Sequence, residues 1–443
     1  MFSKRDLRKL IIPLMIEQIL AVTVGMADTV MVANNGEAAV SGISLVDTIN
    51  ILLINVFSAL ATGGAVVTSQ YLGRNDERNA RIAGKQLIYT VAILSVVIMV
   101  ICLSLRNHLL NLAFGHIDAD VMTNAQTYLF LSALSYPFIA VYNAGAALFR
   151  SMGNSKVSMF ASLLMNIVNI SGNAVLIYGF DMGVAGAGIA SLASRLLACV
   201  FIIILLHRST LPVHVEKLWR FDLKPRMIQN ILRIGVPNGL ENGMFQIGKI
   251  LVQGLIATFG TAAIAANAVA TTVANVAVLP GTAIGLAMIT VVGQCVGAGD
   301  YDQATCYTVK LTKLAYLCMG ILNAVILCAS PALVAFFNLS DTAAKDALLI
   351  LIYHSICAAF LWTASFTLPN GLRAAGDVKY TMIMSIISMW VFRIAFSYLL
   401  ASWMGMGVFG VWIAMTVDWL FRLIVFIGRF VRGKWKNANM LKA

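Results

Sequence analysis

Apolar runs of about twenty residues recur along the whole chain, and short polar loops separate them. Each run is long enough to cross a bilayer as a helix. A transmembrane β-barrel would show shorter segments of alternating polarity instead, and the sequence has none. We therefore expect an all-α polytopic membrane protein with twelve transmembrane helices. Their expected positions are about residues 7–33, 45–70, 84–105, 125–148, 157–179, 186–207, 228–258, 269–292, 308–331, 346–370, 379–401 and 408–430.

Composition and charge support a lipid environment. The 443 residues are 60% hydrophobic and 11% charged, whereas a soluble protein carries about a quarter charged residues. The net charge of +12 does not indicate nucleic-acid binding, because 25 of the 31 Lys and Arg fall in the termini and loops of one side. Only Arg106 and Lys345 lie in the opposite loops. The positive-inside rule then predicts a bacterial inner-membrane protein with both termini cytoplasmic.

The sequence contains an internal repeat. Pro13-x-x-x-Glu17 returns as Pro237-x-x-x-Glu241, at an offset of 224. Each half holds six expected helices, so both halves have the same orientation in the membrane and form a parallel repeat. This arrangement predicts two pseudo-symmetric six-helix bundles, 1–207 and 228–443, joined by a cytoplasmic linker at 208–227. Further matches pair Gln70–Asp76 with Gln294–Asp300 and Gly183–Gly186 with Gly407–Gly410 at 224, and Arg150–Lys156 with Arg373–Lys379 at 223.

The repeated motifs resemble those of one transporter family. Gly25-Met-Ala-Asp28-Thr-Val-Met is similar to the first-helix motif of multidrug and toxic compound extrusion (MATE) transporters, and the Gln-x-x-Gly-x-x-Asp loops are also similar to theirs. So are Leu372-Arg-Ala-Ala-Gly-Asp377 and Asn166-Ile-Val-Asn169. The resemblance implies a secondary active antiporter that works by alternating access. Its partners would be small organic substrates, often cationic, exchanged for H⁺ or Na⁺ with no other cofactor.

Acidic residues within the expected helices are the first functional candidates, because burying a charge in the membrane is costly. Asp28 matches the family's first-helix aspartate, which implies a role in ion coupling and substrate exchange. The alternative is a structural carboxylate bonded to a neighbouring helix. Glu17 lies eleven residues earlier, on the same helix face and about 16 Å away along the axis. It could extend a polar path toward the cytoplasm or belong to an inner gate.

Three asparagines, Asn166, Asn169 and Asn173, have the i, i+3, i+7 spacing of one helix face. Their amide oxygens could share a polar site with Asp28, either beside a protonated carboxyl or as ligands of Na⁺. Interhelical hydrogen bonding is the alternative, since amides commonly supply it in membranes. Apart from Na⁺ at Asp28, we expect no metal site.

The second half offers weaker candidates. Glu241 resembles an acidic residue of the family's seventh helix, but lies one turn nearer the cytoplasm. We expect it to serve in a gate or in substrate recognition, or to be a structural partner of Lys249 or of linker arginines. Trp362 stands where sodium-coupled relatives carry a helix-10 aspartate, which favours H⁺ as the coupling ion. Other cavity candidates are Asp47, Phe360 and Phe366, with a solvated interfacial position as the alternative for Asp47.

Two other function classes compete with drug export. A lipid-linked oligosaccharide flippase of the wider superfamily would have additional helices and more intramembrane arginines. An intramembrane enzyme is disfavoured because the five histidines form no metal pair and no catalytic arrangement lies at one depth. No phosphate-binding glycine loop is present either, so ATP is not the expected energy source. We expect the protein to be a monomer. Within one helix, we expect Asp418 to neutralise Arg422, which lies four residues further along.

Overall fold

The computed structural model describes residues 2–33, 36–115, 118–216, 218 and 221–438, apart from the side chains of Gly25, Met26, Thr29, Ala113 and Phe114. It divides into two compact units. The N-terminal unit is Phe2–Gly239 and the C-terminal unit begins at Leu240. The boundary lies within helix α8 (Pro225–Ala257). The division predicted from the repeat, with a linker at 208–227, stays a prediction.

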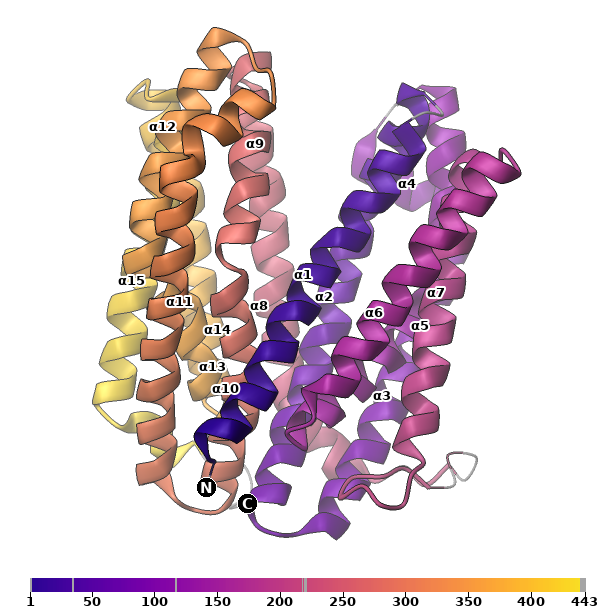
Figure 1. The fold of residues 1–443 in the computed structure, drawn as a ribbon, viewed down its shortest axis with the longest axis vertical. Helices are drawn as coiled ribbons and strands as arrows, with labels where there is room; N and C mark the ends of the chain where they lie inside the picture. Colours follow the sequence, from indigo (N-terminus) through magenta and orange to yellow (C-terminus); the bar gives the residue numbers. More distant parts are fainter. Residues whose placement is uncertain (1, 34–35, 116–117, 217, 219–220, 439–443) are drawn as a thin grey trace. The chain divides into compact units, whose positions relative to one another are not determined.

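The N-terminal unit is a bundle in which α5 packs against α2, α3 and α7, while α1 packs against α6 (Figure 1). A cluster of buried apolar side chains from α2, α5 and α7 fills one part of it. In lipid every backbone polar group needs an internal partner, which is why the apolar runs become continuous helices. The elements are α1 (Lys4–Val32), α2 (Glu37–Gly73), α3 (Glu77–Ser104), α4 (Arg106–Phe114), α5 (Ala119–Ser151), α6 (Ser155–Asn173), the π-helix η2 (Ala174–Gly179) and α7 (Gly183–Leu206).

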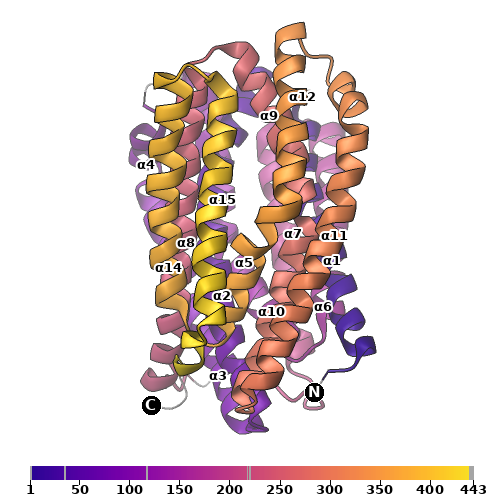
Figure 2. The same cartoon turned by 90° about the vertical axis from the view of Figure 1, so that its left-hand side faces the viewer.

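The C-terminal unit repeats this order with more interruptions. Its helices α11, α12, α14 and α15 face the viewer in Figure 2. The helix α15 packs against the π-helical segments η3, η4 and η5, and α12 packs against α9. The elements after α8 are α9 (Thr261–Ala277), α10 (Leu279–Gly297), α11 (Tyr301–Phe336), α12 (Asp341–Cys357), η3 (Ala358–Thr367), α13 (Leu368–Ala374), α14 (Val378–Ile387), η4 (Ser388–Ala395), η5 (Tyr398–Trp403), α15 (Gly407–Val431) and the 3₁₀ turn η6 (Lys434–Asn437).

The expected fold class is confirmed. Within the described residues the chain is helical without strands, and 10 helical runs are long and apolar enough to span a membrane. The helices α1 and α8 complete the twelve. One expected span, 269–292, lies across the break between α9 and α10. Pro280 stands in the first turn of α10, where its missing N–H leaves no helical bond unmade.

Two spans of the C-terminal unit are each one residue longer than their N-terminal counterparts. Asp341–Ala374 has 34 residues against 33 in Ala119–Ser151, and Val378–Trp403 has 26 against 25 in Ser155–Gly179. The π-helical segments η3 and η4 lie within the longer copies and have no described counterpart in the shorter ones. A π-helical turn accommodates one extra residue. The segment η4 therefore explains why the repeat offset changes from 223 to 224.

The repeated Gln-x-x-Gly-x-x-Asp loops come directly before α3 in the N-terminal unit and before α11 in the C-terminal unit. Asp76 accepts a hydrogen bond from the backbone N–H of Asn79 at 3.0 Å, and Asp300 does the same for Gln303 at 2.9 Å. Its hydrogen bonds with Asn79 hold the pKa of Asp76 below the usual value. The residue before each aspartate is left-handed, Asn75 in one copy and Gly299 in the other. The motif is thus a turn followed by a helix cap.

Candidate functional site

Asp28 lies at the centre of a polar cluster in the N-terminal unit. Its carboxylate is only 5% exposed and accepts hydrogen bonds from Nδ2 of Asn173 at 2.6 Å and Oγ of Ser191 at 3.0 Å. Nδ2 of Asn169 donates to the same Ser191 hydroxyl at 3.0 Å. We call these four residues the Asp28 cluster. It joins α1, α6 and α7, and Ser191 is the member that sequence reasoning missed.

Asp28 differs from the other buried carboxylates in having no cationic partner. No ion pair involves it within the described part of the chain. A buried charge without an opposite charge is costly, so this carboxylate is suited to bind and release a small cation. The other buried acids each have an arginine within 3 Å: Glu17 with Arg150 (2.8 Å), Glu241 with Arg373 (2.6 Å), Asp377 with Arg429 (2.7 Å) and Asp418 with Arg422 (2.9 Å).

The three asparagines contribute differently. Asn169 and Asn173 belong to the cluster, whereas Nδ2 of Asn166 donates to the Ser162 carbonyl of its own helix at 2.9 Å. All three side-chain oxygens are buried and accept no hydrogen bond within the described residues. Unsatisfied buried acceptors are uncommon. In the cluster around the carboxylate of Asp28, the side-chain oxygens of Asn169 and Asn173 fit the ligands that hard cations prefer.

Asp47 and Arg195 lie near the same cluster. Asp47 is half-buried and accepts a hydrogen bond from Nδ2 of Asn50 at 3.1 Å, and the charges of Asp28 and Arg195 both act on it. Arg195 donates to Oγ of Ser135 at 2.6 Å. The polar region of this unit therefore carries two acids and one arginine.

Glu17 and Glu241 occupy equivalent positions, each bonded to the arginine of the fourth span. Glu17 also accepts a hydrogen bond from Oγ of Ser158 at 2.6 Å. Glu241 pairs with Arg373, and not with Lys249 or a linker arginine. These contacts place both glutamates in ion pairs. A role in gating stays a prediction.

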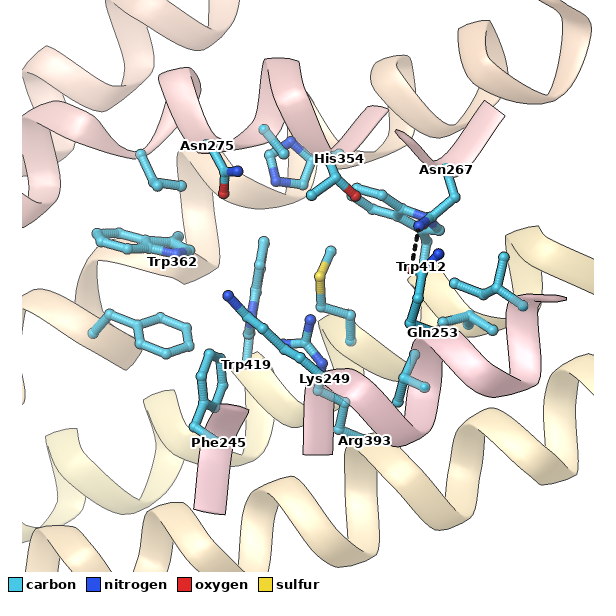
Figure 3. A pocket seen from close by; sticks show the side chains of 18 residues that line it. Phe245, Lys249, Gln253, Asn267, Asn275, His354, Trp362, Arg393, Trp412 and Trp419 are labelled. Carbon is cyan, nitrogen blue, oxygen red and sulfur yellow. Dashed lines mark hydrogen bonds between the residues drawn. The ribbon is translucent and has the colours of Figure 1, made fainter. Parts of the chain in front are cut away.

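The C-terminal unit encloses a cavity of about 320 Å³, which we call the C-terminal cavity. Trp362 and Phe366 line it, and their rings stack with centroids 5.1 Å apart. Phe360 is not among the lining residues and is 69% exposed. It lies two positions before Trp362, so it points to another side of the segment. The lining also includes polar and charged residues that the sequence did not place: Lys249, Gln253, Asn267, Asn275, His354 and Arg393 (Figure 3).

Comparison with known proteins identifies relatives over the whole chain. The family model described as MatE matches residues 13–175 and 237–399. The uncharacterized transporter YisQ of Bacillus subtilis is 28% identical and covers 97% of this chain and 94% of its own length. The probable multidrug resistance protein NorM of Thermotoga maritima is 24% identical over 99% of this chain and 94% of its own. An outward-facing MATE transporter of the MOP superfamily shares the fold, with a TM-score of 0.88, 20% identity, and coverage of 99% and 97%.

Proposed function

This chain belongs to the MatE family, and on that premise we propose that it is a secondary active efflux antiporter. It exports small organic compounds, cations among them, in exchange for H⁺ or Na⁺ by alternating access. The description of the Thermotoga relative as a multidrug resistance protein supports this proposal. The flippase alternative is not favoured by these relatives. We further propose a monomer in the bacterial inner membrane, with both termini cytoplasmic.

The buried carboxylate of Asp28 carries the proposal. It has hydrogen-bond donors but no arginine or lysine partner in the described structure. A permanent arginine partner would already neutralise the carboxylate, so that binding of a transported cation would no longer be favoured. Binding of H⁺ neutralises the carboxylate directly, and Na⁺ does so with the free amide oxygens of Asn169 and Asn173 as additional ligands.

Ion binding at this site can be linked to substrate release. When the cluster opens to the outside, the entering ion neutralises Asp28 and removes its attraction for a cationic substrate. When it opens to the cytoplasm, the ion leaves and the carboxylate is again charged. One carboxylate that alternates between ion and substrate is sufficient for obligatory exchange, because the two ligands require opposite states of the same group.

The test is transport by the purified full chain in proteoliposomes, without ATP. A pH gradient and a Na⁺ gradient are imposed separately, and efflux of a fluorescent organic cation is measured. We expect one gradient to drive transport in the wild type and neither to drive it in Asp28→Asn. The amide is nearly isosteric and accepts the hydrogen bond of Ser191, so folding should survive.

The matched control is Asp120→Asn, which changes an exposed aspartate of the same unit. It should transport like the wild type. Wild-type rates in Asp28→Asn would contradict the assignment of the site. The gradient that drives the wild type identifies the coupling ion, and transport by neither gradient would contradict antiport.

A further inference from the structure

The C-terminal cavity is cationic. Among the 18 described residues that line it none is acidic, while Lys249 and Arg393 both contribute to the lining. Within the described residues the amine of Lys249 has no hydrogen bond and no ion pair. The amine lies over the ring of Phe245, with Nζ 5.0 Å from the ring centroid. The side chain is exposed to open space and reaches between Phe245, Trp362 and Trp419 (Figure 3).

The carboxylate that pairs with Arg393 does not balance this charge. Asp418 is fully buried, is not among the lining residues, and is shared by two guanidinium groups, Arg422 at 2.9 Å and Arg393 at 3.7 Å. Ser388 also donates to it. Together with Lys249, three cations therefore face one anion. An excess of positive charge in an apolar surrounding requires compensation, and a ligand can supply it.

The internal repeat shows that this polarity is the reverse of that in the other unit. At the offset of 224, Asp28 corresponds to Val252 and Asp47 corresponds to Thr271. Both Val252 and Thr271 line the C-terminal cavity. The positions that carry the two acids in the N-terminal unit thus line a cavity without acids in the C-terminal unit.

The two extra π-helical segments shape this cavity. Trp362 and Phe366 belong to η3, and Arg393 belongs to η4. These are the spans in which the C-terminal copy is one residue longer. π-Helical insertions frequently occur at functional sites. Here they turn two stacked rings and a guanidinium into the cavity.

We propose that the C-terminal cavity binds organic anions that carry a flat aromatic ring, such as aromatic sulfonates and carboxylates. The ammonium of Lys249 meets the anionic group, with Arg393 beside it. The ring lies against the stacked pair Trp362 and Phe366 and the indole of Trp419, which touches Phe366 edge-on. A cationic ligand of the same shape is repelled by Lys249 and Arg393. The proposal adds organic anions to the substrates of the proposed efflux function. Transport of these anions rests on that function, whereas their binding does not.

The test compares two ligands of one shape, 2-naphthalenesulfonate and 2-naphthyltrimethylammonium. Binding to the full chain in lipid nanodiscs is measured by titration calorimetry, with empty nanodiscs subtracted. We expect the wild type to bind the sulfonate at least about tenfold more tightly than the ammonium compound. Equal affinity, or a preference for the cation, would overturn the proposal. This comparison needs no variant.

Variants then locate the site. Lys249→Gln should weaken sulfonate binding about tenfold or more, and Lys249→Arg should stay within about threefold of the wild type. Lys249→Glu should prefer the ammonium compound. The control Lys345→Gln removes an exposed lysine of the same unit and should change nothing. Unchanged sulfonate binding in Lys249→Gln would also overturn the proposal.

Asp28→Asn separates this inference from the efflux function. Calorimetry uses no ion gradient, so this variant should bind the sulfonate like the wild type. If the wild type shows no ion-driven export but binds the sulfonate, the efflux proposal is wrong and the anion site stands. If the wild type shows ion-driven export but does not bind the sulfonate, the anion site is wrong and the efflux proposal stands.

Discussion

Arg150 and Glu17 form an ion pair, with Nη1 2.8 Å from Oε1, and the internal repeat reproduces it. Their counterparts Arg373 and Glu241 lie 2.6 Å apart. Each pair ties the first helix of a unit to the end of its fourth span, and in both the side chains are no more than 15% exposed. Both halves of the repeat therefore contain this contact, while Asp28 and Asp47 have no acidic counterparts.

Removing one partner of such a pair should destabilise the protein strongly. We expect Glu17→Gln to cost about 3–5 kcal/mol, because the substitution removes the anion of an ion pair that is largely buried. The exchanged double variant Glu17→Arg with Arg150→Glu should recover part of the loss. The measurement is unfolding of the detergent-solubilised protein. The exposed pair Glu77–Arg81 is the control, and Glu77→Gln should cost less than about 1 kcal/mol. Equal effects of the two substitutions would show that burial does not matter here.

Adding a carboxylate to the Asp28 cluster should change the pH dependence of transport. In Asn173→Asp the new carboxylate lies against Asp28, where the present contact is 2.6 Å. Two carboxylates this close cannot both be ionised, so one keeps its proton to higher pH. For a proton-coupled transporter, the pH dependence of proteoliposome efflux should therefore shift to higher pH. Asn173→Ala provides the comparison, and an identical profile in both variants would contradict the expected charge coupling.

Expression in a pump-deficient bacterium should lower the accumulation of lipophilic cations such as ethidium. The reason is the two-unit transporter architecture together with the unpaired carboxylate of Asp28. Cell fluorescence after loading measures the effect, and Asp28→Asn at equal expression serves as the control. Unchanged accumulation of a broad panel of cations, with the protein present in the membrane, would contradict multidrug export.

Two glycines within helices should respond differently to substitution by alanine. Gly63 lies against the backbone of another helix, whereas Gly320 has open space beside it. A Cβ on Gly63 would lie 2.7 Å from the backbone N of Gly235 and the carbonyl O of Ile231. Gly63→Ala should therefore destabilise the protein by about 1–3 kcal/mol. A Cβ on Gly320, within α11, would meet nothing within 4 Å, so Gly320→Ala should be neutral or stabilise by up to about 1 kcal/mol. Thermal unfolding of both variants measures the difference, and a destabilised Gly320→Ala with an unaffected Gly63→Ala would refute it.

The sequence by itself determined the class of protein, the number of spans and the repeat. Long apolar runs have one stable structure in lipid, since a helix satisfies its own backbone. Local spacing was also sufficient for contacts within a helix, such as Asp418 with Arg422. The Asp28 and Asn173 contact could be expected from the asparagine face, but not its third member Ser191, because one serine on an apolar helix carries no pattern.

Only the tertiary structure decided which charges are paired between different helices. Glu17 and Arg150 are separated by 133 residues, and no periodicity connects them. The same is true of the C-terminal cavity, to which α8, α9, α12, α15 and two π-helical segments contribute. Its cationic character follows from which side chains converge, and from the single extra residue that each π-helical segment inserts. The hydropathy pattern shows neither the convergence of these side chains nor the inserted residues. One inserted residue changes which side chains share a helix face, but it does not change the hydropathy of the segment.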